Sequence, residues 1–266
     1  MAQRDHPASR DAYYWRLFVT GFCFAMFGLA GLVLGLTVFP VLALLPGGSR
    51  RHGRRARSVL QYAMRTFVWL MTGMGGMTYE YRGAEKLGRP GQLIVANHPS
   101  LIDVIFLIGF TPAAVCVVKA AMWRNPFTRL PVTAAGYVSN ATTATMIEGA
   151  AEALAAGESV IMFPEGTRTT PGEAMRFHRG AASVAIRAAQ VVTPVYIRCE
   201  PTAGLVKGLP WYRIPDRRVH LTLEVGEDID VAPFRSAGQQ PPAASRAFND
   251  HLLRTFEQEL VRRGLA

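Results

Sequence analysis

Cysteine is scarce in this sequence, and its placement excludes a disulfide-stabilised protein. The 266 residues include three cysteines, Cys23, Cys116 and Cys199, which lie far apart in apolar surroundings. There is no C-x-x-C pair, and three isolated cysteines do not build a disulfide framework. Because disulfides are rare in reducing compartments, the cysteine content predicts a main domain that lies in the cytosol.

Acidic residues are outnumbered, with 19 Asp and Glu against 29 Lys and Arg and a net charge of +10. A basic protein can bind nucleic acid, but here the basic residues gather beside an apolar segment and do not alternate with aromatic residues. We therefore expect no nucleic-acid partner. An anionic membrane surface fits this arrangement better.

Charge is absent altogether from residues 17–45, a run of 29 positions. About 20 apolar residues are enough to cross a bilayer as a helix. A signal peptide would have a shorter apolar region of about 7 to 15 residues and a small-residue cleavage site. A soluble domain of this size does not normally bury so long an uncharged helix. The segment is therefore predicted to be a membrane helix.

Basic residues without any acid before Glu80 follow this segment: Arg50, Arg51, Arg54, Arg55 and Arg57. The positive-inside rule places this end of the segment in the cytoplasm. Two arrangements remain open. In a single crossing the N-terminus lies outside, whereas a bend at Pro40 makes a re-entrant hairpin with both ends on the cytoplasmic side.

A second apolar stretch, residues 59–74, carries Arg65 as its one charge together with Tyr62 and Trp69. We interpret it as an interfacial helix; the alternative is an ordinary core helix of the domain that follows. The predicted organisation is a flank over 1–16, cytoplasmic or external, membrane-anchoring helices over 17–76 and a cytoplasmic domain over 77–266.

The fold expected for this domain is α/β, with a mixed sheet flanked by helices, because short β-rich runs alternate with helical segments. Thr145 and Glu148 predict a capping box, and Gly157 predicts the end of that helix. Apolar residues at every fourth position from Phe248 to Leu260 predict a terminal helix docked on the core, and residues 235–245 a loop before it. The expected strands read MTYEYRG, QLIVANH, AAVCVVK, GYVS, SVIMF, TPVYIR and VHLTLEV.

One chemically informative segment reads LIVANHPSLIDVIFL. An apolar strand ends at Asn97 and His98, and Asp103 follows five residues after the histidine. A carboxylate on one imidazole nitrogen fixes the tautomer, which leaves the other nitrogen free to take a proton from a hydroxyl. The segment therefore predicts a catalytic dyad. The alternative is a helix-capping aspartate beside a structural histidine.

A second segment, SVIMFPEGTRT, is another apolar strand that ends in a polar loop. Its glycine, Gly166, permits close approach of the backbone to a ligand. Arg168 offers a guanidinium that can bind phosphate with two hydrogen bonds. Strand ends are where α/β proteins place their sites, so we expect the two loops to form one active site.

Together the two segments resemble the 1-acylglycerol-3-phosphate acyltransferase family of glycerolipid acyltransferases, and the similarity covers about residues 77–230. The resemblance implies an N-terminal membrane-embedding helical pair, a cytoplasmic α/β domain and an acyl-CoA or acyl carrier protein thioester as donor, with no other cofactor. It implies that His98 is the general base and that Asp103 orients it. The loop implied to bind the acceptor consists of Glu165, Gly166, Thr167 and Arg168.

One departure from the family concerns the acceptor. Many members carry an arginine shortly after the glycine of GYVSN, where this chain has Asn140. Arg168 and Lys119 remain to bind a phosphate. Lysophosphatidate is the leading acceptor, and a different lysolipid or a specialised polyene-type lipid is the alternative. A non-catalytic lipid-binding protein is the alternative of another class, but it would not explain the dyad beside the polar loop.

Other chemistries fit the sequence less well. Cys116 lies inside an apolar strand, where cysteines are usually inert. Ser100 needs no acylation, because a thioester is already activated. His98 and Asp103 make an incomplete metal site, and no third ligand stands at a suitable spacing, so we expect no metal. His178 and His220 are interpreted as surface or packing residues.

Overall fold

A computed structural model describes residues 12–170, 172–201, 210, 212–235 and 241–265. Its centre is a mixed sheet, as predicted. All seven predicted strands are present, and the two-residue strand β8 was not foreseen. Strand β6 pairs antiparallel with β7 and β8, and the other pairs are parallel. The order is β1 (Met77–Arg82), β7 (Val219–Val225), β6 (Val191–Glu200), β2 (Leu93–Ala96), β5 (Val160–Met162), β3 (Val115–Val118) and β4 (Val138–Ser139), with β8 (Ile229–Asp230) beside β6.

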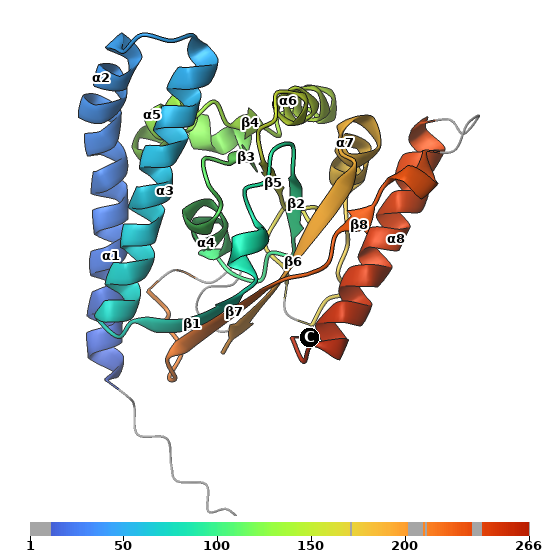
Figure 1. The fold of residues 1–266 in the computed structure, drawn as a ribbon. Coiled ribbons are helices and arrows are strands. Elements are labelled where there is room, and N and C mark those ends of the chain that lie inside the picture. Colours follow the sequence, from blue (N-terminus) through green and yellow to red (C-terminus); the bar gives the residue numbers. More distant parts are fainter. Residues whose placement is uncertain (1–11, 171, 202–209, 211, 236–240, 266) are drawn as a thin grey trace, which may run out of the picture.

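Helices cover both faces of the sheet (Figure 1). Side chains along β2 alternate between the two sides, as strand geometry requires. Ile94 and Ala96 pack in the core shared with α3 and α4, whereas Leu93 and Val95 pack in the core shared with α6, α7 and α8. Because both faces are covered, β2 is apolar throughout. The helices of the domain are α4 (Asp103–Phe110), α5 (Pro126–Ala134), α6 (Thr143–Ala155), α7 (Gly180–Ala188) and α8 (Pro241–Arg262).

The predicted capping box of α6 is wrong. The helix begins at Thr143, and the N-cap is Thr142, whose hydroxyl accepts a hydrogen bond from the backbone N–H of Thr145 at 3.2 Å. A threonine three residues before the expected one therefore satisfies the first turn. The predicted end is confirmed, since Gly157 has a φ of 77° just after the helix.

Helix α8 docks on the core as predicted, with Phe248, Leu252 and Phe256 fully buried. The loop predicted over residues 235–245 is wrong from Pro241 onward, because the helix begins there. Proline is tolerated in the first helical turn, where its missing N–H would have no intrahelical partner. Residues 236–240 lie outside the described part of the chain.

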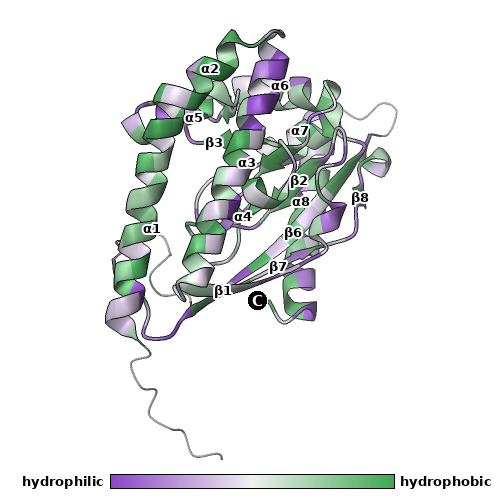
Figure 2. Cartoon of the chain, turned by 60° about the vertical axis from the view of Figure 1, so that its left-hand side comes forward, coloured by the Kyte–Doolittle hydropathy of each residue, from purple (hydrophilic) through white to green (hydrophobic). Residues whose placement is uncertain are grey.

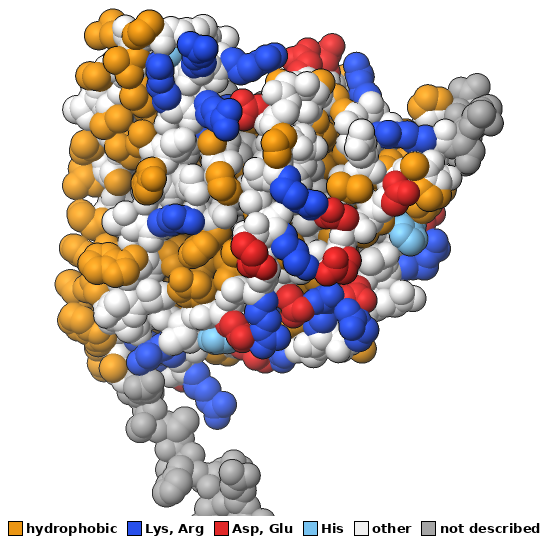
Figure 3. Space-filling view, in the orientation of Figure 1, with side chains coloured by type: hydrophobic (Ala, Val, Ile, Leu, Met, Phe, Trp, Pro, Cys, Tyr) orange, Lys and Arg blue, Asp and Glu red, His pale blue; other side chains and the backbone are white. Residues whose placement is uncertain are grey.

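The N-terminal apolar segment forms one continuous helical rod. It consists of α1 (Tyr13–Val33), a π-helical segment (Leu34–Val38) and α2 (Phe39–Leu44). The rod is long and apolar enough to cross a membrane. Its most apolar stretch of 18 residues has a mean hydropathy of 2.3, and 11% of that stretch is buried inside the protein. Hydrophobic side chains cover this edge of the molecule (Figure 3). The chain does not reverse at Pro40; it reverses after α2, and α3 (Ser49–Gly73) runs back beside α1 (Figure 1).

Helix α3 combines the arginine cluster and the second apolar stretch (Figure 2). Its inner face packs on the domain, while Tyr62 and Trp69 are exposed. Arg57 is buried. Its guanidinium donates to the carbonyl oxygens of Ala113 at 2.7 Å and Ala135 at 3.1 Å and forms an ion pair with Glu158 at 2.7 Å. This arginine therefore belongs to the protein core and does not add to the positive surface.

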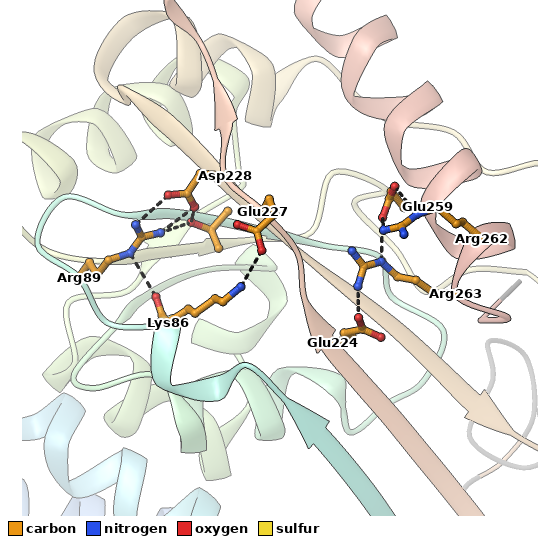
Figure 4. Close-up of polar contacts among 9 residues, drawn as sticks. Lys86, Arg89, Glu224, Glu227, Asp228, Glu259, Arg262 and Arg263 are labelled. Atoms are coloured by element: carbon orange, nitrogen blue, oxygen red, sulfur yellow. Dashed lines mark hydrogen bonds and ion pairs between the residues drawn. The ribbon is translucent and has the colours of Figure 1, made fainter.

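Charged pairs gather near the ends of β1, β7 and α8 (Figure 4). Arg89, after β1, places both terminal nitrogens 2.7 Å from the carboxylate of Asp228, after β7. The pKa of Asp228 is lowered, chiefly by this hydrogen-bonded arginine. The remaining pairs drawn are Lys86 with Glu227, Arg263 with Glu224 and Glu259, and Arg262 with Glu259.

Candidate active site

The site begins where β2 ends. Strand pairing stops at Ala96, and the side chain of Asn97 continues it. Its amide nitrogen donates to the carbonyl oxygen of Ile197 at 2.7 Å, and its amide oxygen accepts from the N–H of Ile197 at 2.8 Å. A buried amide with both groups satisfied holds the strand end firmly. The next residue, His98, is thereby placed just beyond the carboxyl end of β2, a strand in the middle of the sheet.

His98 and Asp103 are in contact, as the five-residue spacing suggested. His98 Nδ1 lies 2.9 Å from Asp103 Oδ2, and the carboxylate is fully buried in the first turn of α4. The same carboxylate accepts from the backbone N–H of Ser100 at 2.7 Å and from the Ser100 hydroxyl. These donors leave the carboxylate little freedom, so it holds the imidazole with Nδ1 protonated and Nε2 as the free acceptor.

The imidazole is also held by packing. Its ring stacks on Phe163 with a centroid distance of 4.3 Å, and Phe163 directly follows β5. The His98 side chain is 18% exposed and lines a cavity. A ring fixed on one side and open on the other suits a base that must reach a substrate.

The loop after β5 holds the backbone of His98. Glu165 Oε1 accepts from the N–H of His98 at 2.9 Å and from the hydroxyl of Thr169 at 3.0 Å. The N–H of Thr169 donates in turn to the carbonyl oxygen of His98 at 2.7 Å. Burial raises the pKa of Glu165, and these hydrogen bonds oppose that shift. One carboxylate oxygen of Glu165 is thus engaged within the protein, and the acceptor-binding role implied for this residue stays a prediction.

The cavity beside His98 has a volume of about 850 Å³, within the range of small-molecule sites. Most of its wall is apolar and comes from α1, α3, α4 and α5, including Phe27, Phe67 and Ile108. The cavity therefore connects the imidazole with the helices that carry the exposed hydrophobic surface. The apolar lining is chemically suited to a hydrocarbon chain.

Three cationic side chains belong to the polar part of the wall. They are Lys119, Arg168 and Arg179, which lie with His178 and the first residue of α7 along the cavity. Helix N-termini carry partial positive charge, so α7 adds to the attraction for an anion. Of the predicted polar loop, Gly166 and Arg168 line the cavity. Gly166 has a φ of 63°, a conformation that favours glycine.

Asn140 also lines the cavity, but its amide oxygen is engaged. It accepts from the backbone N–H of Ala120 at 3.1 Å, while the N–H of Asn140 donates to the carbonyl oxygen of Val118. Asn140, which directly follows β4, is thus bonded to the end of β3 and to the turn after it.

Sequence reasoning missed several residues of the site. Phe163 and Thr169 flank the predicted loop and touch His98, and His178, interpreted as a surface or packing residue, lines the cavity. In the sequence, an apolar residue before a loop and a histidine outside any motif do not indicate that these side chains lie at the site. Tyr137 also lines the cavity from the segment between α5 and β4.

The part of the chain that the structure describes contains no group of three His, Cys, Asp or Glu side chains that could hold a metal ion. Cys116 is fully buried, and burial raises the pKa of its thiol to about 12. Such a thiol carries almost no thiolate at neutral pH, so it is a poor nucleophile.

Residues 78–198 match the family model described as Acyltransferase, which spans both polar loops. These residues form an acyltransferase domain. The family and the acyl-transfer chemistry predicted from the two segments are thereby confirmed.

Named relatives of this acyltransferase act on lysolipids according to their descriptions. It is 27% identical over 178 residues to a 1-acyl-sn-glycerol-3-phosphate acyltransferase from Pseudomonas aeruginosa, covering 65% of this chain and 67% of the relative. It is 30% identical over 178 residues to a lyso-ornithine lipid O-acyltransferase from the same organism, covering 65% of each chain. These alignments span about two thirds of the relatives' own length.

A solved structure shares the fold of this acyltransferase. The crystal structure of the 1-acyl-sn-glycerophosphate acyltransferase PlsC from Thermotoga maritima has a TM-score of 0.65 and covers 94% of this chain and 98% of its own. At 18% sequence identity this likeness concerns the fold, and it confirms the predicted mixed α/β sheet with flanking helices.

Proposed function

We propose that this acyltransferase moves a fatty acyl group from an acyl-CoA or acyl carrier protein thioester to the hydroxyl of a lysolipid. The leading acceptor is 1-acylglycerol-3-phosphate, which would give phosphatidate. The observation that carries the proposal is the buried contact between His98 and Asp103 at the wall of a large apolar cavity with cationic groups.

His98 is the proposed general base. Its Nε2 takes the proton of the acceptor hydroxyl as the oxygen attacks the thioester carbonyl carbon. Asp103 stabilises the imidazolium through Nδ1. The tetrahedral intermediate then collapses: the carbon–sulfur bond breaks, the proton passes from the imidazolium to the leaving thiolate, and an ester and a free thiol result. This reaction needs no cofactor other than the donor thioester.

The apolar part of the cavity is the proposed site of the acyl chain. Its walls come from α1, α3, α4 and α5, so a chain bound there is surrounded by hydrocarbon. Burial of apolar surface contributes about 25 cal/mol per Å², which favours long chains over short ones.

The acceptor head group is proposed to lie at Lys119, Arg168 and Arg179. Phosphate suits this set, since charge-assisted hydrogen bonds contribute about 1.5 to 3 kcal/mol each. A lysolipid with a less anionic head group is the second candidate. It is favoured by Asn140, where many members carry an arginine, and by the similarity to a lyso-ornithine lipid O-acyltransferase.

The proposed location is the membrane, with the domain on the cytoplasmic face. The exposed apolar surface of α1 and α2 supports embedding in lipid. The exposed arginines at the start of α3 support attachment to anionic lipids and a cytoplasmic position for that end.

The deciding experiment is to incubate membranes containing the protein with labelled acyl thioesters and a panel of lysolipids, and to identify the products by mass spectrometry. Phosphatidate is the expected product, and the His98→Ala variant should not form it. Arg168→Ala should raise the KM for lysophosphatidate. Another acylated lipid without phosphatidate would replace the leading acceptor. If wild type and His98→Ala give the same products in the same amounts, the result would support a lipid-binding protein without catalysis.

A further inference from the structure

The segment before β7 presents three arginines whose side chains are exposed. They are Arg213, Arg217 and Arg218, within residues 212–218. None of the three guanidinium groups forms an ion pair within the part of the chain that the structure describes. Asp216 is the one acid among these residues, so the segment is net positive. Such a surface attracts an anionic partner.

Arg16, in the first turn of α1, fixes this segment to the start of the apolar rod. Its buried guanidinium donates to the carbonyl oxygens of Pro215 and Arg217 at 2.9 Å each and to that of Asp216. These hydrogen bonds engage only the backbone of the segment. The exposed arginine side chains are therefore held beside the rod while their guanidinium groups can still reach a partner.

The turn after α3 brings Trp15 to the same place. The indole N–H of Trp15 donates to the carbonyl oxygen of Met74 at 2.9 Å. A Cβ atom at the next residue, Gly75, would lie 3.8 Å from a terminal nitrogen of Arg218. Trp15 and Arg218 thus border one turn, and the Trp15 side chain is 49% exposed. An exposed indole beside cations at the end of an apolar helix is typical of the head-group region of a membrane.

Basic side chains therefore border the apolar rod at both ends (Figure 3). Arg50, Arg51 and Arg54 are exposed at the start of α3, next to the end of the rod, and residues 212–218 supply the cations at its start. A guanidinium can bind a lipid phosphate with two hydrogen bonds. Apolar surface with a basic and aromatic border fits the boundary between hydrocarbon and anionic head groups.

We propose that Arg213, Arg217 and Arg218 form a second binding site for anionic phospholipid head groups, with Trp15 at the same depth beside them. The site lies at the end of the rod opposite to the arginine cluster of α3. This inference rests on the proposed membrane location. It adds that the start of the rod selects anionic lipids, whereas the apolar surface of the rod embeds in any bilayer.

The test adds purified full-length protein, diluted out of detergent, to vesicles of phosphatidylcholine with or without phosphatidylglycerol. Cosedimentation gives a partition coefficient for each kind of vesicle, and their ratio is the preference for anionic lipid. In the triple variant Arg213→Gln, Arg217→Gln and Arg218→Gln this preference should fall by about a hundredfold, or about fivefold for each arginine. Partition into pure phosphatidylcholine should not change, because the apolar rod is intact. Glutamine also keeps the backbone carbonyl that Arg16 binds at position 217.

The matched control is the triple variant Arg187→Gln, Arg246→Gln and Arg254→Gln. These arginines are exposed on α7 and α8, which lie on the other side of the molecule from α1 (Figure 1), and their removal lowers the net charge equally. The control should keep the wild-type preference.

Three results overturn the proposal: a wild type without any preference for phosphatidylglycerol, a variant of residues 213, 217 and 218 that keeps the preference, or a control that loses as much. Wild type that binds vesicles with phosphatidylglycerol but not pure phosphatidylcholine would contradict the embedding of the rod in the proposed function. In that case the effect of the three arginines on binding to phosphatidylglycerol still decides the site by itself.

Discussion

Glu165 accepts a hydrogen bond from the backbone N–H of His98, with 2.9 Å between Oε1 and the nitrogen, although the two residues are 67 positions apart. Thr169 completes the contact, because it bonds both the Glu165 carboxylate and the His98 carbonyl. The loop after β5 and the loop after β2 are therefore one unit. Through it, Glu165 holds the backbone from which the imidazole extends.

Substitutions of Glu165 should separate positioning from substrate binding. Glu165→Gln keeps an acceptor oxygen for the His98 N–H and should retain much of the activity. Glu165→Ala leaves that N–H unpaired and should lower kcat by about tenfold to a hundredfold, with little change in the acceptor KM. Steady-state kinetics with lysophosphatidate measures both constants. A large rise in KM with unchanged kcat would show that Glu165 binds the acceptor.

The stability of the protein should also depend on pH through Glu165. Its pKa is raised by burial, so the folded state retains the proton at pH values where the unfolded state, with a pKa of about 4.3, loses it. The free energy of unfolding should thus fall as pH rises through this interval. Glu165→Gln removes the effect, so its stability relative to wild type should increase from about pH 4 upward. Denaturant unfolding at several pH values measures the difference; a constant difference would contradict the prediction.

The orienting carboxylate should matter greatly for catalysis. Asp103→Asn should reduce the acyl-transfer rate by up to about 10⁴, since an amide no longer fixes the His98 tautomer. His98→Ala should be at least as severe. Because Asp103 also accepts from Ser100, circular dichroism must show that the variant is folded. Near-normal turnover in a folded His98→Ala variant would exclude this histidine as the base.

Gly31 should be essential for the packing of α1. A Cβ atom there would overlap the carbonyl oxygen of Phe127 in α5. Gly31→Ala should therefore destabilise the folded protein by about 1 to 3 kcal/mol, as overpacking usually does. Gly73→Ala is the matched control, because a Cβ at Gly73 meets nothing within 4 Å. Thermal unfolding in detergent compares the two; equal melting temperatures would show that α1 does not depend on this contact.

The start of α3 should face the cytoplasm. Arg54 is exposed, whereas the native Cys23, Cys116 and Cys199 are buried, so the variant Arg54→Cys offers one accessible thiol among the described residues. A membrane-impermeant maleimide should leave intact cells unlabelled and label the variant after permeabilisation. Labelling of intact cells would place the arginine cluster outside.

The sequence by itself determined the elements that depend on neighbouring residues. Apolar runs predicted seven of the eight strands described, though not their order in the sheet. The separation of His98 and Asp103 predicted their contact, because the turn into α4 brings residues five apart together. Apolar residues at every fourth position predicted the terminal helix. Its start was not predicted, because prolines are typical of loops and of first helical turns alike.

The tertiary structure decided what depends on distant segments. In the sequence, Arg57 belongs to a basic cluster expected at the surface. In the structure, the carbonyl oxygens of Ala113 and Ala135 and the carboxylate of Glu158 hold it in the core. The resemblance implies that Glu165 binds the acceptor, and the structure shows in addition that its carboxylate accepts a hydrogen bond from the backbone of His98. Hydrogen-bonding capacity is visible in a sequence, but the partner that satisfies it is chosen by packing.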